Sequence, residues 1–294
     1  MASLKEVKTR ITSVTSTQQI TKAMKMVAAA KLRRSQDRIW QMRPFAQKMT
    51  SILQNLSSVS NDGDTWYNDV RPEEKVLIVV ISSDRGLAGS FNTNVFKGVN
   101  ALIHAKYASQ LSKGNISILP LGKKGLDYYG KRKFPIIGEF VGVFQGLSFD
   151  KVAEVGDYLI NVYRKGECDK IELVYNEFKN VATQILNAEQ WLPVVPVKSS
   201  GNQTALQIDY IFQPNQEEIL TGLILKSLKV QLYKAVLDSN ASENGARMTA
   251  MDKANENAGE LLKDLKLMYN RTRQAAITTE ILEIVAGAEA LKSV

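Results

Sequence analysis

Residue types that carry most enzymatic chemistry are scarce in this sequence of 294 residues, and those present stand apart. His104 is the only histidine and lies in a predicted helix, which excludes a histidine-based triad and a multi-histidine metal site. Cys168 is the only cysteine, so no intrachain disulfide is possible and a reducing compartment is expected. The sequence predicts no catalytic residue, no metal site and no cofactor.

One loop, SDRGLAGSFN at 83–92, stands where a phosphate-binding loop would, between a buried strand and a helix. It lacks the Gly-x-x-x-x-Gly-Lys-Ser/Thr pattern whose amides and lysine hold phosphates. Gly86 and Gly89 alone do not make a dinucleotide fingerprint either. We interpret them as a tight strand-to-helix turn, and we expect no small-molecule ligand.

The middle of the chain alternates apolar strands with amphipathic helices, which is typical of a Rossmann-like α/β domain with a parallel-rich sheet. The expected strands are KVLIVVIS, NISILPLG, IIGEFVG, KIELVYNEF and an edge strand within TQILNAEQWLPVVPV. The expected helices are 92–111, GKKGLDYYGK and 148–165.

A 3.5-residue repeat of mostly apolar or small residues runs without proline from about Asn215, a candidate N-cap, to Ala286. A repeat of that length predicts a coiled-coil helix. Its track is Ile219, Leu223, Lys226, Val230, Tyr233, Leu237, Asn240, Asn244, Arg247, Met251, Ala254, Ala258, Leu261, Leu265, Met268, Thr272, Ala275, Thr279, Leu282 and Ala286.

The N-terminal part repeats with the same period, so the two ends of the chain predict a long antiparallel helix pair on a globular base. Its track is Leu4, Val7, Ile11, Val14, Gln18, Thr21, Lys25, Ala28, Leu32, Ser35, Ile39, Met42, Ala46, Met49, Leu53 and Leu56. Pro44 predicts a kink or a new segment. The track is polar at Gln18, Thr21 and Lys25, and the apolar residues nearby, Ile20, Met24 and Val27, lie off it. This local irregularity is either register noise or a set of contacts with an outside partner.

The first helix is the shorter one, so Met1 is expected beside about residue 274. The last twenty residues, AAITTEILEIVAGAEALKSV, would then project unpaired. They are apolar on nearly every side, and such a helix requires burial that this chain cannot supply. Another protein is expected to cover them.

The net charge of +8 is concentrated at the start, where residues 1–36 hold eight basic side chains and only Glu6 as an acid. A solvated helix face, an acidic protein partner, nucleic acid and an anionic membrane surface all remain open. The start lacks the apolar core of a secretory signal, and we interpret it as mature structure because it shares the following repeat. The longest aliphatic run, Val76 to Ile81, is too short to span a bilayer.

The expected organisation has four parts. They are an N-terminal coiled-coil helix (1–58), a linker (59–74), the Rossmann-like α/β domain (75–205), and a C-terminal coiled-coil helix with its projecting tip (206–294).

Four segments, in order, closely resemble signature segments of the gamma subunits of F-type ATP synthases. They are TQQITKAMKMVAAAKLRRSQ at 17–36, SDRGLAGSFN at 83–92, SENGARMTAMDKANENA at 242–258 and YNRTRQAAITTEILEIVAGAEAL at 269–291. The resemblance implies a non-catalytic rotor shaft within a ring of alternating alpha and beta subunits, with catalysis on beta. It also implies a base beside the epsilon subunit and the c-subunit ring, peripheral to the cytoplasmic face of a bacterial cell membrane. Proton or sodium flow would turn the c ring.

The same resemblance implies partner contacts at particular positions. Those with the alpha/beta ring are Met24, Lys25, Arg247, Arg273, Gln274, Thr278, Glu280, Ile281, Ile284 and Val285. Those with the c ring or epsilon, at the foot, are Tyr210 and Gln213.

Two other classes of protein compete with this interpretation. A nucleic-acid-binding coiled coil would explain the basic start, but it predicts groove-reading aromatic or Arg-rich segments, and the tail is apolar. An enzyme built on the doubly wound domain predicts nucleotide binding or hydrolysis by the chain alone.

Overall fold

The computed structural model describes residues 3–57, 66–69, 71–138, 140–181, 183–194 and 216–292. Asn215, Tyr210 and Gln213 lie outside these residues, as does half of the expected linker. The chain divides into two compact units, which are described separately: one combines Met1–Ala28 with Met248–Val294, and the other is Ala29–Arg247.

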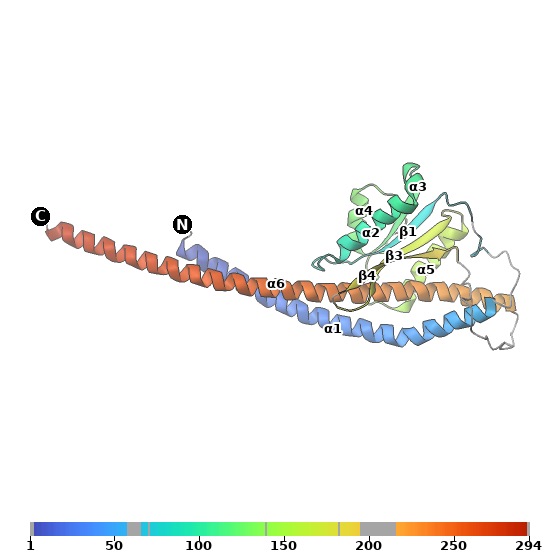
Figure 1. The fold of residues 1–294 in the computed structure, drawn as a ribbon, viewed down its shortest axis with the longest axis horizontal. Helices are drawn as coiled ribbons and strands as arrows, with labels where there is room; N and C mark the ends of the chain where they lie inside the picture. The colour runs from blue at the N-terminus through green and yellow to red at the C-terminus, as the bar shows by residue number, and fades with distance from the viewer. Residues whose placement is uncertain are drawn as a thin grey trace. The chain divides into compact units, whose positions relative to one another are not determined.

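The larger unit contains a four-stranded sheet (Figure 1). Its strands are β1 (Val76–Ile81), β2 (Ile116–Leu121), β3 (Lys170–Phe178) and β4 (Gln184–Leu192). Their order is β2-β1-β3-β4, with β1 parallel to both β2 and β3, and with β4 antiparallel at the edge. The prediction of a parallel-rich sheet with an edge strand is confirmed.

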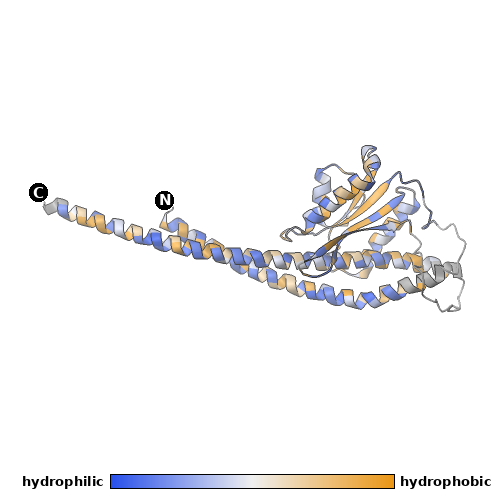
Figure 2. Cartoon of the chain, in the orientation of Figure 1, coloured by the Kyte–Doolittle hydropathy of each residue, from blue (hydrophilic) through white to orange (hydrophobic). Residues whose placement is uncertain are grey.

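Alternate residues of β1 face opposite sides of the sheet, as strand geometry requires. Ile78 and Val80 join a core with α2 (Phe91–Lys106), whereas Leu77 and Val79 join one with α5 (Phe149–Arg164). Both faces are covered, which explains why the strand reads as an unbroken apolar run. The hydrophobic strands stand out in Figure 2.

The remaining short helices are α3 (Ala108–Ser112) and α4 (Lys123–Lys131). The expected helix 92–111 is divided at Tyr107, whose buried side chain donates a hydrogen bond to the buried Glu172. The helix at 148–165 is confirmed as α5, and the Ser148 side chain caps it by accepting from the Lys151 amide.

The expected strand IIGEFVG is wrong, since its described residues make only two isolated bridges, Ile118–Ile136 and Leu121–Phe140. Gly138 and Gly142 have φ values of +76° and +92°, outside the β region. An apolar run interrupted by such glycines cannot continue a ladder.

The two longest helices are α1 (Leu4–Ser57) and α6 (Gln216–Lys292). Of the two alternatives expected at Pro44, a kink or a new segment, the new segment is wrong, because α1 continues through this residue. A proline inside a helix costs about 3 kcal/mol. In the larger unit Leu32 and Ile39 are buried in the core and Met42 packs against it, and this burial offsets the cost.

In the unit formed by the chain ends, α1 and α6 pair antiparallel. Lys25 lies beside Asp252, and a Cβ on Gly259 would lie 3.3 Å from Gln18 Nε2. Every predicted track position of α1 in this unit is buried or half-buried: Leu4, Val7, Ile11, Val14, Gln18, Thr21, Lys25 and Ala28. The polar residues of the track stay in the seam, whereas Ile20 and Val27, which lie off the track, are exposed.

The seam of α6 in this unit follows most of its predicted track, including Met251, Ala258 and Leu265, and departs from it at two positions. Leu262 is buried and Tyr269 half-buried, whereas the predicted Leu261 and Met268 are exposed. Adjacent leucines satisfy a 3.5-residue period equally well, so the repeat alone could not choose between them. In the other unit, Lys226 is also exposed rather than on the seam.

Burial along α6 ends at Thr272, and all residues of 273–289 are exposed. This matches the expected end of pairing near residue 274. Hydrophobic positions continue through this stretch (Figure 2). None of the helices in the described part of the chain is long and apolar enough to cross a membrane.

Asp238 of α6 is buried in the larger unit. Burial raises the pKa of its carboxyl to about 6, and Glu177 adds to the rise while Lys234 opposes it. A raised carboxyl pKa gives stability at low pH that is lost as the pH rises through 6. Asp238→Asn is therefore expected to stabilise the fold at pH 8 by up to about 3 kcal/mol, and by much less at pH 4.

Thermal unfolding of the two proteins at both pH values measures this difference. Equal shifts at pH 4 and pH 8 would show that the ionisation of Asp238 is not responsible.

Candidate partner-binding surfaces

The paired helices hold one ion pair at the margin of their seam. Lys25 Nζ lies 2.6 Å from Asp252 Oδ1, with the two side chains 40% and 42% exposed. A pair in that setting is worth at most about 1 kcal/mol, but it orients the Lys25 side chain along α6. Met24, the neighbouring predicted contact, is half-buried.

The outer face of α1 in this unit carries an apolar patch that consists of Ile20, Met26 and Val27. All three side chains are more than half exposed. Of the two interpretations of the off-track residues Ile20 and Val27, this placement favours contact with an outside partner, since both point away from the seam. Sequence reasoning did not include Met26, although its position off the repeat was a usable signal.

In the larger unit Arg247 is bound within the chain. Its Nη1 lies 2.7 Å from Glu243 Oε1, and its Nη2 donates to the backbone carbonyls of Arg85 and Gly86 at 3.2 and 3.3 Å. Burial raises the pKa of the Glu243 carboxyl, and the Arg247 guanidinium opposes that rise. Arg247 therefore fixes the loop 83–90 to α6.

The same loop is fixed at both of its ends. The Ser83 amide donates to Asn92 Oδ1 at 3.0 Å, and the Lys123 amide donates to Asp84 Oδ1 at 3.1 Å. Its polar groups thus serve intrachain bonds, in keeping with a structural turn. Leu87, at φ +64°, is 65% exposed at the surface of this fixed loop. A bulky exposed residue with positive φ is a candidate contact that the sequence did not reveal.

The predicted contacts on the last part of α6 are all exposed: Arg273, Gln274, Thr278, Glu280, Ile281, Ile284 and Val285. The Thr278 hydroxyl donates to the Gln274 carbonyl within the helix, at 2.9 Å. Ile277 and Leu282 are exposed as well, which makes this surface apolar on several sides. Arg247, a further predicted contact, belongs to the other unit.

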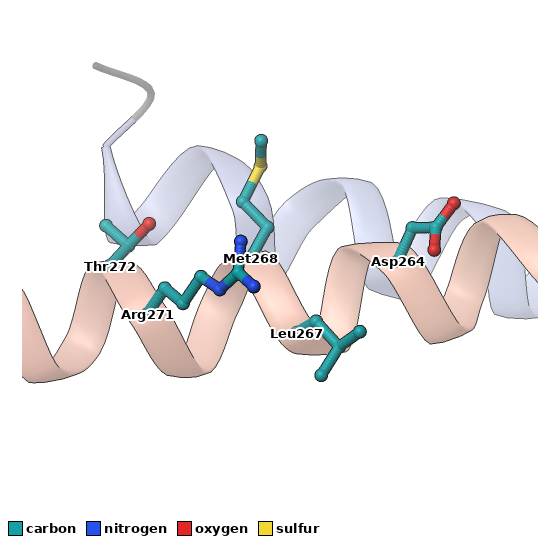
Figure 3. Close-up of a pocket in the computed structure, with 5 residues that line it drawn as sticks. All are labelled: Asp264, Leu267, Met268, Arg271 and Thr272. Carbon is teal, nitrogen blue, oxygen red and sulfur yellow. The ribbon is translucent and has the colours of Figure 1, made fainter.

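A shallow recess on α6 is lined by Asp264, Leu267, Met268, Arg271 and Thr272 (Figure 3). All five project from successive turns of one helix, so their polar groups do not converge on a common point. Small-molecule sites are concave and have converging polar groups, and this recess lacks the second feature.

Groups of acidic, histidine or cysteine side chains that could hold a metal ion are absent from the described residues. Burial raises the pKa of the Cys168 thiol to about 12, which keeps it neutral and unreactive at physiological pH.

Comparison with known proteins gives one consistent result. The family model described as ATP synthase matches residues 3–291. The chain is similar to the ATP synthase gamma chain of Cytophaga hutchinsonii, 56% identical over the whole of both chains. It is similar to that of Flavobacterium psychrophilum, 53% identical over 99% of this chain and all of the relative.

Solved structures agree with these relatives. The central stalk and c-ring structure of the Tetrahymena thermophila mitochondrial ATP synthase contains a chain 26% identical, with a TM-score of 0.57, over 80% of this chain and 99% of that one. A chain of the Euglena gracilis mitochondrial ATP synthase has a TM-score of 0.67 at 22% identity, and the match covers 98% of this chain and 94% of that one. At this identity the likeness shows a shared fold only.

Replacing Arg247 tests its fixing of the loop. Arg247→Met leaves the Glu243 carboxyl buried without its cation, which is expected to cost about 2–4 kcal/mol of stability. The double change Glu243→Gln with Arg247→Met should recover part of that loss, because a neutral amide is easier to bury. Urea unfolding of both variants measures the two effects, with the exposed Arg273→Met as a control that leaves stability unchanged. A loss below about 0.5 kcal/mol in Arg247→Met would contradict the assignment.

Proposed function

The chain belongs to the ATP synthase family, among its gamma chains, and from this premise we propose that it is the central-stalk rotor subunit of a proton- or sodium-translocating ATP synthase. It couples rotation of the c ring to conformational cycling of the alpha/beta ring. It is non-catalytic, and the catalytic sites lie on the beta subunits. The observation that carries the proposal is identity of 46–56% to gamma chains over essentially the whole chain.

The proposed mechanism needs a surface that differs around the helix pair. The apolar patch Ile20, Met26 and Val27 lies on one side of α1, whereas the Lys25–Asp252 pair lies at the seam. A turning shaft with such a surface makes different contacts with each surrounding subunit at each angle. Because a contact shifts an equilibrium only by its differential affinity for the two states, each angle favours a different beta conformation.

The apolar surface at the C-terminal end of α6 supports the proposal that this end is buried within the alpha/beta ring. Ile277, Ile281, Leu282, Ile284 and Val285 are large apolar residues exposed on one helix. Water is a poor environment for such a surface, and an apolar bearing formed by the ring would cover it. Arg273, Gln274, Thr278 and Glu280 would make polar contacts just before it.

The remaining contacts complete the proposed assembly. Lys25 and Met24 face a beta lever arm. Arg247 acts at the ring surface through the loop that it fixes. Tyr210 and Gln213, outside the described residues, meet the c ring and epsilon. The protein is then peripheral, at the cytoplasmic face of a bacterial membrane, with no nucleic acid and no small-molecule ligand.

Purification of the tagged chain from a mild detergent extract of its own membranes tests the assembly. We expect two large Walker-motif subunits in the eluate, together with Mg-ATPase activity that the chain alone lacks. ATP hydrolysis by the chain alone would favour the enzyme class instead. Nucleic acid without those subunits would contradict the rotor proposal.

Lys25→Glu places two carboxylates together at the seam and reverses the charge offered to a beta lever arm. We expect reduced coupling, measured as ions translocated per ATP hydrolysed in membrane vesicles. The swapped pair, Lys25→Glu with Asp252→Lys, separates the causes: recovery assigns the effect to the intrachain pair, and no recovery assigns it to the lever arm. Unchanged coupling in the single variant would remove Lys25 from the mechanism.

Deletion of residues 283–294 should weaken retention of the chain in the ring without unfolding the α/β core, to which these residues do not belong. Co-purification yield measures retention, and thermal unfolding of the truncated chain measures folding. Loss of the cooperative transition would contradict this separation of roles.

A further inference from the structure

The seam between α1 and α6, in the unit formed by the chain ends, changes character along its length. Toward the start of α1 it is apolar, with Val7, Leu262 and Leu265 buried in it. Between residues 18–25 of α1 and 252–259 of α6 it is made mostly of polar or small residues, and we call this stretch the polar segment. A helix pair is held together by the apolar side chains of its seam, so the polar segment is its weakest part.

Two contacts define how the helices face each other in the polar segment. Lys25 Nζ lies 2.6 Å from Asp252 Oδ1, and a Cβ on Gly259 would lie 3.3 Å from Gln18 Nε2. The first contact joins two partly exposed ions, which stabilises the pair little, and the second places an amide beside a residue without a side chain. Hydrophobic stabilisation scales with the apolar area removed from water, so neither contact supplies much of it.

The middle of the polar segment buries a hydrogen-bond acceptor without a partner. Thr21 and Asn255 lie midway between the two contacts, on α1 and α6 respectively. The Thr21 hydroxyl donates to the Gln18 carbonyl at 3.0 Å, and no donor in the described part of the chain reaches the buried Asn255 Oδ1. Water would bind this oxygen if the helices separated, so its burial opposes closure of the seam.

The outer face of the same stretch of α1 carries the apolar side chains that the seam lacks. Ile20, Met26 and Val27 are all more than half exposed. In an ordinary helix pair such residues lie between the helices. Here the burial of apolar surface must come from a partner outside the pair, and α6 does not supply it.

Hydroxyl groups also make α1 easier to bend along this stretch. The Thr15, Ser16 and Thr17 hydroxyls donate to backbone carbonyls four residues earlier, at 2.8, 3.1 and 3.0 Å. Such bonds compete with the hydrogen bonds of the helix itself and favour bending. A helix that bends here can leave its partner over a few turns while the apolar part of the seam stays paired.

We propose that α1 and α6 separate along the polar segment in the chain without its partners, and that they close there when the alpha/beta ring covers Ile20, Met26 and Val27. The inference rests on the proposed function, which supplies the ring. A ring that surrounds the shaft has room for the paired helices and excludes the separated ones. Because the ring binds the closed form better, assembly shifts the equilibrium toward closure.

An ordered water gives the competing explanation. A water molecule that donates to Asn255 Oδ1 would satisfy the buried acceptor and keep the polar segment closed in the free chain. The two explanations therefore differ in the distance between the helices before assembly.

Two pairs of nitroxide labels on the full-length chain measure that distance by pulsed electron–electron double resonance. One pair, Lys22→Cys with Glu256→Cys, spans the polar segment, and the other, Ser13→Cys with Lys263→Cys, spans the apolar part of the seam. All four positions are exposed, whereas Cys168 is buried and stays unlabelled. We expect the first pair to show a long-distance component in the free chain that is lost on assembly. The second pair should give the same single distance in both states.

A variant of the seam tests the cause. Thr21→Leu with Asn255→Leu makes the middle of the polar segment apolar, so the long-distance component should be lost in the free chain as well. Thr12→Leu with Asn257→Leu is the matched control, since it makes the same changes at two exposed positions. This control should keep the long-distance component.

The outcomes separate the two proposals. A single short distance for the first pair in the free chain, as an ordered water predicts, would overturn this inference and leave the rotor function intact. The same holds for a long-distance component that persists in the assembly, or that the second pair also shows. Failure of the unlabelled wild-type chain to co-purify with Walker-motif subunits would overturn the rotor function, and closure by the ring with it.

Discussion

The seam between α1 and α6, in the unit formed by the chain ends, is the interaction that determines which side chains this chain offers to partners. Val7, Ala28, Met251 and Leu265 are buried along it, and such burial supplies roughly 25 cal/mol per Å² of apolar surface. The apolar residues Ile20, Met26 and Val27, which lie off the seam, are left in water. Pairing also ends near Thr272, and this leaves the rest of α6 to be covered by others.

Much of the fold could be predicted from the sequence, because period and turn chemistry act locally. The strand KIELVYNEF, the helix at 148–165 and the α1 seam were all readable. Part of the α6 seam was not, because Leu261 and Leu262 both satisfy the repeat and only tertiary packing selects between them. The backbone at Gly138 and the helix through Pro44 likewise depend on three-dimensional context.

The candidate contact surfaces also include some features that the sequence predicts and others that it does not. Exposure of the α6 end could be predicted, since it follows from a difference in helix length. The bonds from Arg247 to the carbonyls of Arg85 and Gly86 join residues more than 160 positions apart, and no local sequence pattern predicts them. Leu87 was missed because exposure is invisible in a sequence.

Rotation itself is the most direct test of the central claim. Cys168 is buried and unreactive, so a thiol introduced by Lys113→Cys, on the exposed turn after α3, is the one that reacts within this chain, which is labelled before assembly with its partners. A bead attached there, on an assembly immobilised through its ring subunits, reports the motion of this chain in a light microscope. Unidirectional rotation that starts on addition of Mg-ATP is the predicted result. A bead that shows only Brownian motion while the same assembly hydrolyses ATP would contradict the account.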